Sequence, residues 1–174
     1  SICLFNIHTN ENRLLKANEL DSIEIDIEGN LEMNNRGEIV IDCVDVERER
    51  TSICVSTFES SEYELLEIPN VGSAVIGFSL GDLTDSGLLA MSCEVANGDE
   101  RETEICLVDH DGRGFEVLTE RRAYAENIDP AINMAGAIAY RCDEAICVID
   151  AEGLYFRELV ETGVFAGTGY PAIQ

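Results

Sequence analysis

Short runs of alternating apolar and polar residues dominate the pattern of this chain. The run "GAIAYRC" from Gly136 starts at a glycine, alternates, and reaches a cysteine six positions later, as do "GEIVIDC" from Gly37 and "GLLAMSC" from Gly87. Alternation with a period of two predicts strands, because successive side chains of a strand point to opposite faces of the sheet. No stretch shows sustained helical periodicity with capping residues, and we expect "NENRLLKANEL" (10–20) to be non-helical as well. The expected fold class is therefore all-β.

A second run begins with Ile-Cys and occurs four times. A leucine follows thirteen residues after the isoleucine in every copy, without a gap. The copies start 51, 52 and 41 residues apart, a spacing typical of propeller blades. They read "ICLFNIHTNENRLL" from Ile2, "ICVSTFESSEYELL" from Ile53, "ICLVDHDGRGFEVL" from Ile105 and "ICVIDAEGLYFREL" from Ile146.

Turn residues separate these runs. The segments "DHDGRG" and "DAEG" place Asp and Gly where a tight hairpin needs a positive φ or side-chain capping. Each full unit then reads as four antiparallel strands, such as "PAIN", "GAIAYRC", "ICVID" and "FREL" in the last full copy. Radial repetition of such units predicts a β-propeller, or part of one, and we expect residues 1–174 to form a single, incomplete repeat domain. The units are approximately 1–22 (partial), 23–70, 71–124, 125–165 and 166–174 (partial), with "YPAIQ" (170–174) as a closing first strand.

Six of the seven cysteines form three pairs, each with one cysteine at the end of a second strand and one at the start of a third strand. The intervening lengths of 10, 12 and 4 residues are all even, which keeps both side chains of a pair on one face. We expect the paired cysteines to lie directly opposite each other, at non-hydrogen-bonded positions, as structural cross-strand disulfides. The pairs are Cys43 with Cys54, Cys93 with Cys106, and Cys142 with Cys147.

The seventh cysteine, Cys3, is unpaired in the chain because its unit lacks a second strand. Its partner is expected before Ser1 or in another chain. Buried free thiols are one alternative for the six paired cysteines. Metal ligation is another, although the spacing is not CxxC…CxxC and only His8 and His110 offer nitrogen ligands. Disulfides predict an oxidising compartment: the outside of the cell, its surface, or the periplasm.

The charge is strongly acidic, with 35 Asp and Glu against 11 Lys and Arg and a net charge of −24. This balance argues against nucleic acid and anionic membrane as partners, because both would be repelled. No apolar run approaches the roughly 20 residues of a transmembrane helix, so membrane insertion is not expected. Such a surface suits high salt, divalent cations or a cationic partner, or it simply favours solubility.

Three segments resemble the bacterial NxxGxxAF tandem repeat, whose usual form is Asn-Asp-x-Gly-x-Val-Ala-Phe. They are "NNRGEIVI" (34–41), "TDSGLLAM" (84–91) and "NMAGAIAY" (133–140), and "DPAIN" and "GYPAIQ" resemble the Pro-x-Ile-Asn lead-in of that family. The TolB-like and WD-type propellers are more distantly similar, and their Trp-Ser-Pro-Asp-Gly signature is missing here. The resemblance implies a secreted or surface-anchored, propeller-like protein without catalytic residues. The matching positions are Asn34, Gly37 and Val40, then Gly87 and Ala90, then Asn133, Gly136 and Ala139, with Tyr140 in place of the Phe.

Two motifs suggest chemistry only in part. Asp109, Asp111 and Gly112 resemble the start of a calcium loop, and a hairpin turn explains them equally well. The segment "GFSLG" (77–81) matches GxSxG, but that motif works only on a strand–turn–helix, and here it precedes a β-repeat. We therefore expect a turn at the first place and interpret the GxSxG match as a coincidence.

Two further segments suggest interaction surfaces. Arg121 and Arg122 are the only adjacent basic pair in the sequence. The segment "VFAGTGYP" (164–171) is small, apolar and Gly-rich, which fits the crossover between propeller blades, where propellers usually bind partners.

We therefore expect a non-catalytic, extracellular or cell-surface β-propeller scaffold or protein-interaction module, with no catalytic residue, cofactor or metal ligand. The expected partners are other subunits, or further chain, that complete the propeller, in a homo-oligomer or filament built by strand sharing. The alternatives are a glycan- or calcium-binding propeller and the accessory subunit of a secreted enzyme.

Overall fold

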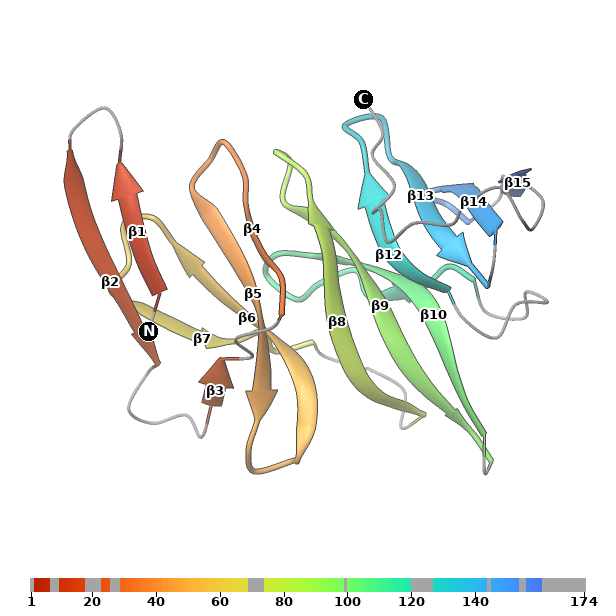
Figure 1. Cartoon of the computed structure of the whole chain (residues 1–174), viewed down its shortest axis with the longest axis horizontal. Helices are drawn as coiled ribbons and strands as arrows, with labels where there is room; N and C mark the ends of the chain where they lie inside the picture. Colours follow the sequence, from red (N-terminus) through yellow and green to blue (C-terminus); the bar gives the residue numbers. More distant parts are fainter. Residues whose placement is uncertain are drawn as a thin grey trace.

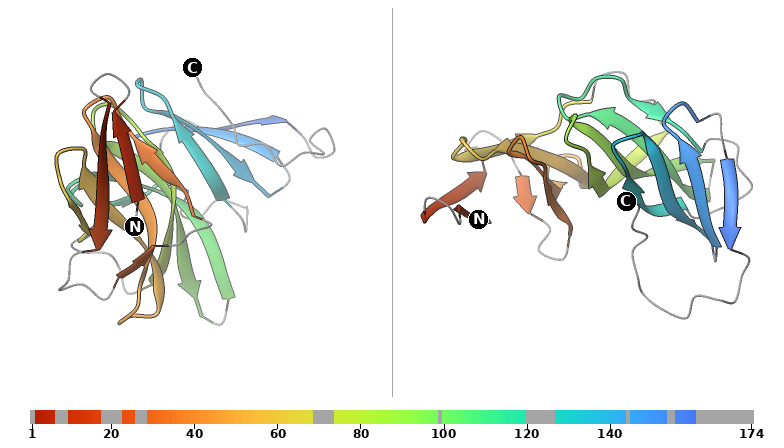
Figure 2. Two further views of the ribbon diagram at one scale, coloured as in Figure 1. Left: turned by 60° about the vertical axis from the view of Figure 1, so that its left-hand side comes forward. Right: turned by 90° about the horizontal axis from the view of Figure 1, so that it is seen from above.

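The computed structural model describes residues 2–6, 10–17, 23–25, 29–68, 74–98, 100–119, 127–143, 145–153 and 156–160. Within these ranges there are fifteen strands and no helix, so the expected all-β class is confirmed (Figure 1). Seen from above, the sheets follow one another along an arc (Figure 2). The segment from Glu11 to Ala17, which we expected to be non-helical, is a strand.

The first sheet has seven strands. Five of them, β3 to β7, form the unit that corresponds to the second and third sheets, and β1 and β2 form a separate hairpin. Two short strands, β3 and β4, lie one after the other along the same edge of β5, so together they form one interrupted first strand. The hairpin β1–β2 joins this sheet through a short parallel pairing of β2 with β7. The strands are β1 (Ile2–Asn6), β2 (Glu11–Ala17), β3 (Ile23–Ile25), β4 (Leu31–Met33), β5 (Glu38–Asp45), β6 (Arg50–Thr57) and β7 (Glu62–Leu65).

The second and third sheets are each a meander of four antiparallel strands in chain order. The second sheet has β8 (Val75–Leu83), β9 (Leu88–Asn97), β10 (Glu100–Asp109) and β11 (Glu116–Val117). The third has β12 (Asn127–Ile132), β13 (Ala137–Cys142), β14 (Ala145–Asp150) and β15 (Phe156–Val160).

The same turn connects the first and second strands of all three sheets. In each turn the glycine N–H donates a hydrogen bond, 3.0 Å long, to the carbonyl of the residue three positions earlier. The side chain of Asn34, Thr84 or Asn133 accepts hydrogen bonds from backbone N–H groups of its own turn, which is how Asn and Thr stabilise turns. The turn needs a positive φ, which glycine adopts without steric cost. The angle is 76° at Gly37, 89° at Gly87 and 81° at Gly136.

In three of the four copies, the leucine that follows Ile-Cys lies on the fourth strand or directly after it and pairs with the isoleucine. Ile2 pairs with Leu15 in the β1–β2 hairpin. In the first and second sheets the leucine N–H donates to the isoleucine carbonyl at 2.8 Å, from Leu66 to Ile53 and from Leu118 to Ile105. In the third sheet Ile146 pairs with Val160 instead, because the register of β14–β15 shifts after this pair. The hairpin β1–β2 therefore repeats the third and fourth strands of a full sheet.

The sheets pack face to face through apolar side chains. One core cluster joins the first and second sheets, and a second cluster joins the second and third. A third cluster lies between the first sheet and the hairpin β1–β2, which contributes Leu4 and Leu15. Neighbouring residues on β5 and β9 enter different clusters, because successive side chains point to opposite faces. Each of these strands is thus buried on both faces.

Two carboxylates connect the sheets by hydrogen bonds to backbone groups. Asp42 of the first sheet accepts the N–H of Leu80 in the second sheet, at 2.6 Å. Asp82 of the second sheet accepts the N–H of Ile132 in the third sheet, at 2.9 Å. A buried carboxylate needs such donors, so each bond ties the position of one sheet to the next.

The contact between β8 and β12 leaves no room at Gly81, and this generates a prediction. A Cβ atom there would lie 2.6 Å from the carbonyl oxygen of Pro130 and 2.8 Å from that of Ala90. We expect Gly81→Ala to lower the free energy of unfolding by about 1–3 kcal/mol, because the second and third sheets must move apart. Urea unfolding measures the change. Gly98→Ala is the control: its Cβ would meet no atom within 4 Å, and only the φ of 67° opposes it, at about 1 kcal/mol. Equal losses for both variants would show that the sheets are not tightly packed at Gly81.

Candidate functional site

The structure contains three disulfides, and they join the cysteines that the sequence paired. Each disulfide lies between the second and third strands of one sheet, with Cα–Cα distances of 5.9, 6.0 and 5.9 Å. All six cysteines are buried within the apolar clusters between sheets. They therefore staple strands inside the core. The bonds are Cys43–Cys54, Cys93–Cys106 and Cys142–Cys147.

The expected geometry of these pairs was wrong in one respect. The cysteines are not directly opposite each other but diagonal, offset by two residues: Cys43 pairs with Ser52, and Cys54 pairs with Ile41. The other two sheets have the same offset. The even spacing still places both sulfurs on one face, because an offset of two preserves the side-chain alternation. The right-handed twist of paired strands brings one diagonal closer, which explains how this arrangement closes.

Cys3 differs from its equivalents. It lies on β1 at the position that Cys54, Cys106 and Cys147 occupy on the third strands of the sheets. Those three cysteines are fully buried in disulfides, whereas Cys3 is exposed and free. Within the described part of the chain, β1 pairs only with β2. No described strand therefore lies along the side of β1 on which a second strand would pair.

The other chemical motifs take the forms expected of turns and strands. Asp109 and Asp111 belong to the turn after β10, where Gly112 N–H donates to the Asp109 carbonyl and Asp111 accepts the N–H of Arg113. The GxSxG match lies inside β8, with Ser79 exposed on a strand and not on an elbow. His8, Arg121, Arg122, and the segments 164–171 and 170–174 lie outside the described residues.

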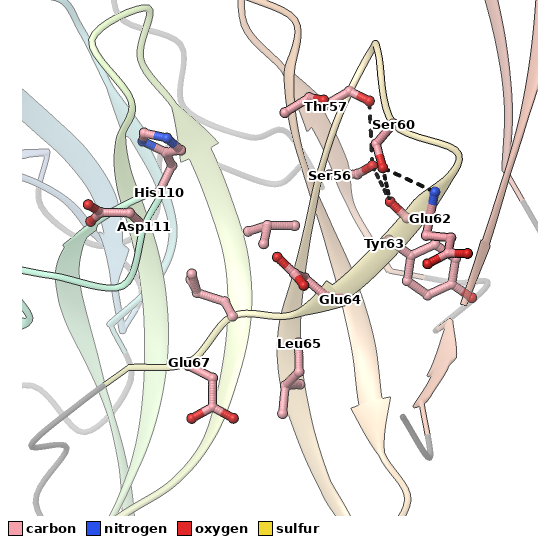
Figure 3. A pocket seen from close by; sticks show the side chains of 12 residues that line it. Ser56, Thr57, Ser60, Glu62, Tyr63, Glu64, Leu65, Glu67, His110 and Asp111 are labelled. Carbon is pink, nitrogen blue, oxygen red and sulfur yellow. Dashed lines mark hydrogen bonds between the residues drawn. The ribbon is translucent and has the colours of Figure 1, made fainter. Parts of the chain in front are cut away.

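A groove of about 600 Å³ lies between strands β6 and β7 of the first sheet and the turn after β10 (Figure 3). Strands β6 and β7 form one wall, and His110 and Asp111 stand opposite. Glu64 points from β7 into the space between them (Figure 3). Neither lysine nor arginine lines the groove as far as the structure describes it, so its field is negative. Its four carboxylates are those of Glu62, Glu64, Glu67 and Asp111.

The walls of the groove are held by hydrogen bonds that leave its glutamates available. The hydroxyls of Ser56 and Ser60 both donate to the Glu62 carbonyl, at 2.7 and 2.8 Å, and so fix the start of β7. The backbone N–H of His110 donates to the Gly87 carbonyl at 2.8 Å, and its imidazole Nε2 lies 3.2 Å from Oε1 of Glu38 in the first sheet. Glu64 and Glu67 are exposed and form no ion pair with a described residue. The groove can therefore accept a cationic group.

Sequence reasoning did not assemble this groove. The sequence places Asp111 in a calcium loop or a hairpin turn and offers His110 as a nitrogen ligand, and neither interpretation relates them to β7. The available signal was the alternation in "EYELLE" (62–67), which places Glu62 and Glu64 on the same face of a strand. Nothing in the sequence predicts that the turn after β10 lies opposite this face.

Glu32 and Asp82 form an acidic pair outside the groove, on the first strands of neighbouring sheets. Glu32 of β4 is half-buried, and its pKa is raised above the ordinary 4.5, first by burial and second by the charge of Asp82. Asp82 accepts the N–H groups of Leu83 and Ile132, both at 2.9 Å. The charged form of Glu32 is therefore disfavoured mainly by burial and to a lesser degree by the neighbouring Asp82 carboxylate, which takes the Ile132 N–H of the third sheet.

Two comparisons with known proteins, one with family models and one with curated proteins, find no relative. No family model matches the chain, and no curated protein matches it. The described ranges contain no helix, and so none that is long and apolar enough to cross a membrane. Nor do three His, Cys, Asp or Glu side chains gather there in a group suited to a metal ion. The NxxGxxAF resemblance stays a hypothesis.

The raised pKa of Glu32 predicts how a substitution depends on pH. A carboxyl whose folded-state pKa is raised weakens the fold only when pH exceeds its unfolded pKa, because only then must the folded protein carry the disfavoured charge. We expect Glu32→Gln to increase the free energy of unfolding at pH 7, by up to about 1 kcal/mol after solvent screening, and to have little effect at pH 4. Urea unfolding at both pH values measures this. Glu24→Gln, an exposed position on β3, is the control. The same gain at pH 4 as at pH 7 would contradict the electrostatic cause.

Proposed function

We propose that this chain is a non-catalytic protein-interaction scaffold of the β-propeller type, working outside the cell or at its surface. The observation that carries the proposal is the contrast between Cys3 and its three equivalents. The sheet with a disulfide between its second and third strands occurs three times, and the fourth occurrence presents only its third and fourth strands. A strand added along β1 would give this unit the arrangement of the other three.

The stacking of the sheets supports a propeller arrangement. Successive four-stranded meanders pack face to face, use the same first turn, and are connected by carboxylate–backbone bonds from one sheet to the next. Radial repetition of such sheets is the propeller design, in which each unit contacts only its neighbours. The similarity of the turns to the Asn-x-x-Gly of the NxxGxxAF repeat supports the same assignment.

The disulfides support the location. Disulfides form and persist in oxidising compartments and are rare in the cytosol. Each closes a short loop, with sequence separations of 11, 13 and 5 residues, and contributes about 2–3 kcal/mol by the loop-entropy relation. Three such bonds suit a durable scaffold in a medium without chaperones.

The acidic groove supports a cationic partner. Its four carboxylates face a space large enough for lysine or arginine side chains, and the chain as a whole carries a charge of −24. Long-range attraction would speed the approach of a positively charged segment, and the groove would fix where it binds. The partner of this scaffold is therefore a protein segment rich in Lys and Arg.

The side of β1 along which no described strand lies predicts selective capture of a strand. The probe is a synthetic peptide of residues 136–142, which carries the sequence of β13 and ends in its cysteine. In a glutathione redox buffer we expect it to form a mixed disulfide with Cys3, because pairing along β1 raises the local thiol concentration. Intact mass spectrometry measures the adduct. A scrambled peptide with the same terminal cysteine is the control, and it should react several-fold less.

Two further measurements make this test decisive. Alkylation without prior reduction should label one thiol, and Cys3→Ser should abolish both the label and the adduct. Equal adduct yields from the matched and scrambled peptides would show that Cys3 is merely an exposed thiol and that β1 does not recognise a strand.

The groove predicts salt-dependent binding of a cationic peptide. The probe is a short oligolysine, titrated by calorimetry at low and at high salt. We expect the double variant Glu64→Gln, Glu67→Gln to weaken binding roughly five-fold, since two surface charge pairs contribute about 1 kcal/mol together. The control variant Glu24→Gln, Glu100→Gln removes the same charge at exposed positions outside the groove. If both variants lose affinity equally, the peptide responds to net charge and the groove is not the site.

A further inference from the structure

A second groove, of about 560 Å³, has the opposite character. It lies where the tip of the β5–β6 hairpin in the first sheet meets the start of β8 and the β9–β10 hairpin in the second. Three arginines from these two hairpins line it, although the whole chain has only 11 basic residues. Two of its lining residues are carboxylates. The charged residues of this arginine groove are Arg48, Arg50, Arg101, Glu49 and Glu94.

Two of the arginines have partners that use only part of their donor capacity. Arg48 forms an ion pair with Asp45, with Nη1 2.9 Å from Oδ2. Arg101 lies 3.6 Å from Glu94, and both side chains are largely exposed, at 71% and 45%. An exposed pair at this distance contributes little, so Arg101 is available for another anion. A guanidinium has five N–H donors, and one carboxylate does not satisfy them.

Arg50 has a buried hydrogen-bond donor that its described surroundings do not satisfy. Its Nε is buried, yet no acceptor for it exists among the residues the structure describes, and its side chain forms no ion pair with them. A buried charged donor without an acceptor costs free energy that a bound anion would recover. Glu49, next to it in the turn, is exposed and held at a φ of 50°, without an ion pair to a described residue.

We propose that the arginine groove binds an oxyanion, with Arg50 as its main ligand and Arg48 and Arg101 beside it. The guanidinium fork matches the paired oxygens of a carboxylate, sulfate or phosphate. In a chain of net charge −24, an anion reaches this position only because three arginines from two sheets converge on it. The site is independent of the acidic groove, which lies elsewhere between the same two sheets and is lined by different residues.

The test titrates sulfate, phosphate and acetate separately into the intact protein, against chloride at equal ionic strength. The readout is the arginine Nε–H signal in nitrogen–proton correlation spectra, assigned to Arg50 by its loss in Arg50→Lys. We expect a saturable shift of this signal with at least one oxyanion and none with chloride. Preference for sulfate and phosphate would identify a tetrahedral group, and preference for acetate a carboxylate.

Three variants make the result specific. Arg50→Lys keeps the charge but loses the fork, and should weaken binding about five- to ten-fold, followed by the remaining arginine signals. Glu49→Gln removes an opposing charge at an exposed turn, and should strengthen binding several-fold. Arg141→Lys, on β13 outside the groove, should leave affinity unchanged. No saturable shift, or equal affinity for Arg50→Lys and Arg141→Lys, would overturn the proposal and show general ionic screening.

Discussion

The structure depends on strands that are apolar on both faces. Residues 39–43 of β5 are buried without exception, and so are residues 89–93 of β9. Side chains alternate between faces, so a sheet built on such a strand exposes apolar surface wherever a neighbouring sheet is missing. Face-to-face stacking removes that surface from water, and the hydrophobic effect makes it the dominant favourable contribution. The first and second sheets, which are built on β5 and β9, are therefore each packed on both faces.

Polar contacts then determine how the stacked sheets are positioned. Apolar packing is largely non-directional, whereas a carboxylate in a buried place requires donors at defined positions. Asp42 and Asp82 take backbone N–H groups of the following sheet and so fix its register. The disulfides act within a sheet instead, and they lie in the apolar interface between sheets. Apolar packing thus holds the sheets together, the carboxylates position one sheet against the next, and the disulfides join strands within a sheet.

Charge is distributed unevenly over this framework. Many of the acidic side chains that the structure describes lie at exposed positions, where their mutual repulsion is screened by water and salt. At two places the junction of the first and second sheets gathers charged side chains: four carboxylates around the groove beside β7, and three arginines with two glutamates at the hairpin tips. Both places combine residues from two sheets, so neither exists in an isolated repeat. The interaction surfaces that we propose are consequences of stacking.

The sequence by itself determined the strands, the turns after the third strands of the second and third sheets, and the cysteine pairs. Each of these depends on short apolar runs, on Asp and Gly at a tight turn, or on an even spacing within one hairpin. It also indicated that Cys3 has no partner nearby. The tertiary structure alone decided the two-residue offset of the disulfides, because strand twist is not encoded in spacing. It also decided that His110 faces β7 and that Arg101 joins Arg48 and Arg50. Those contacts link residues of different sheets, and the distance between them in space follows from packing and not from any period in the sequence.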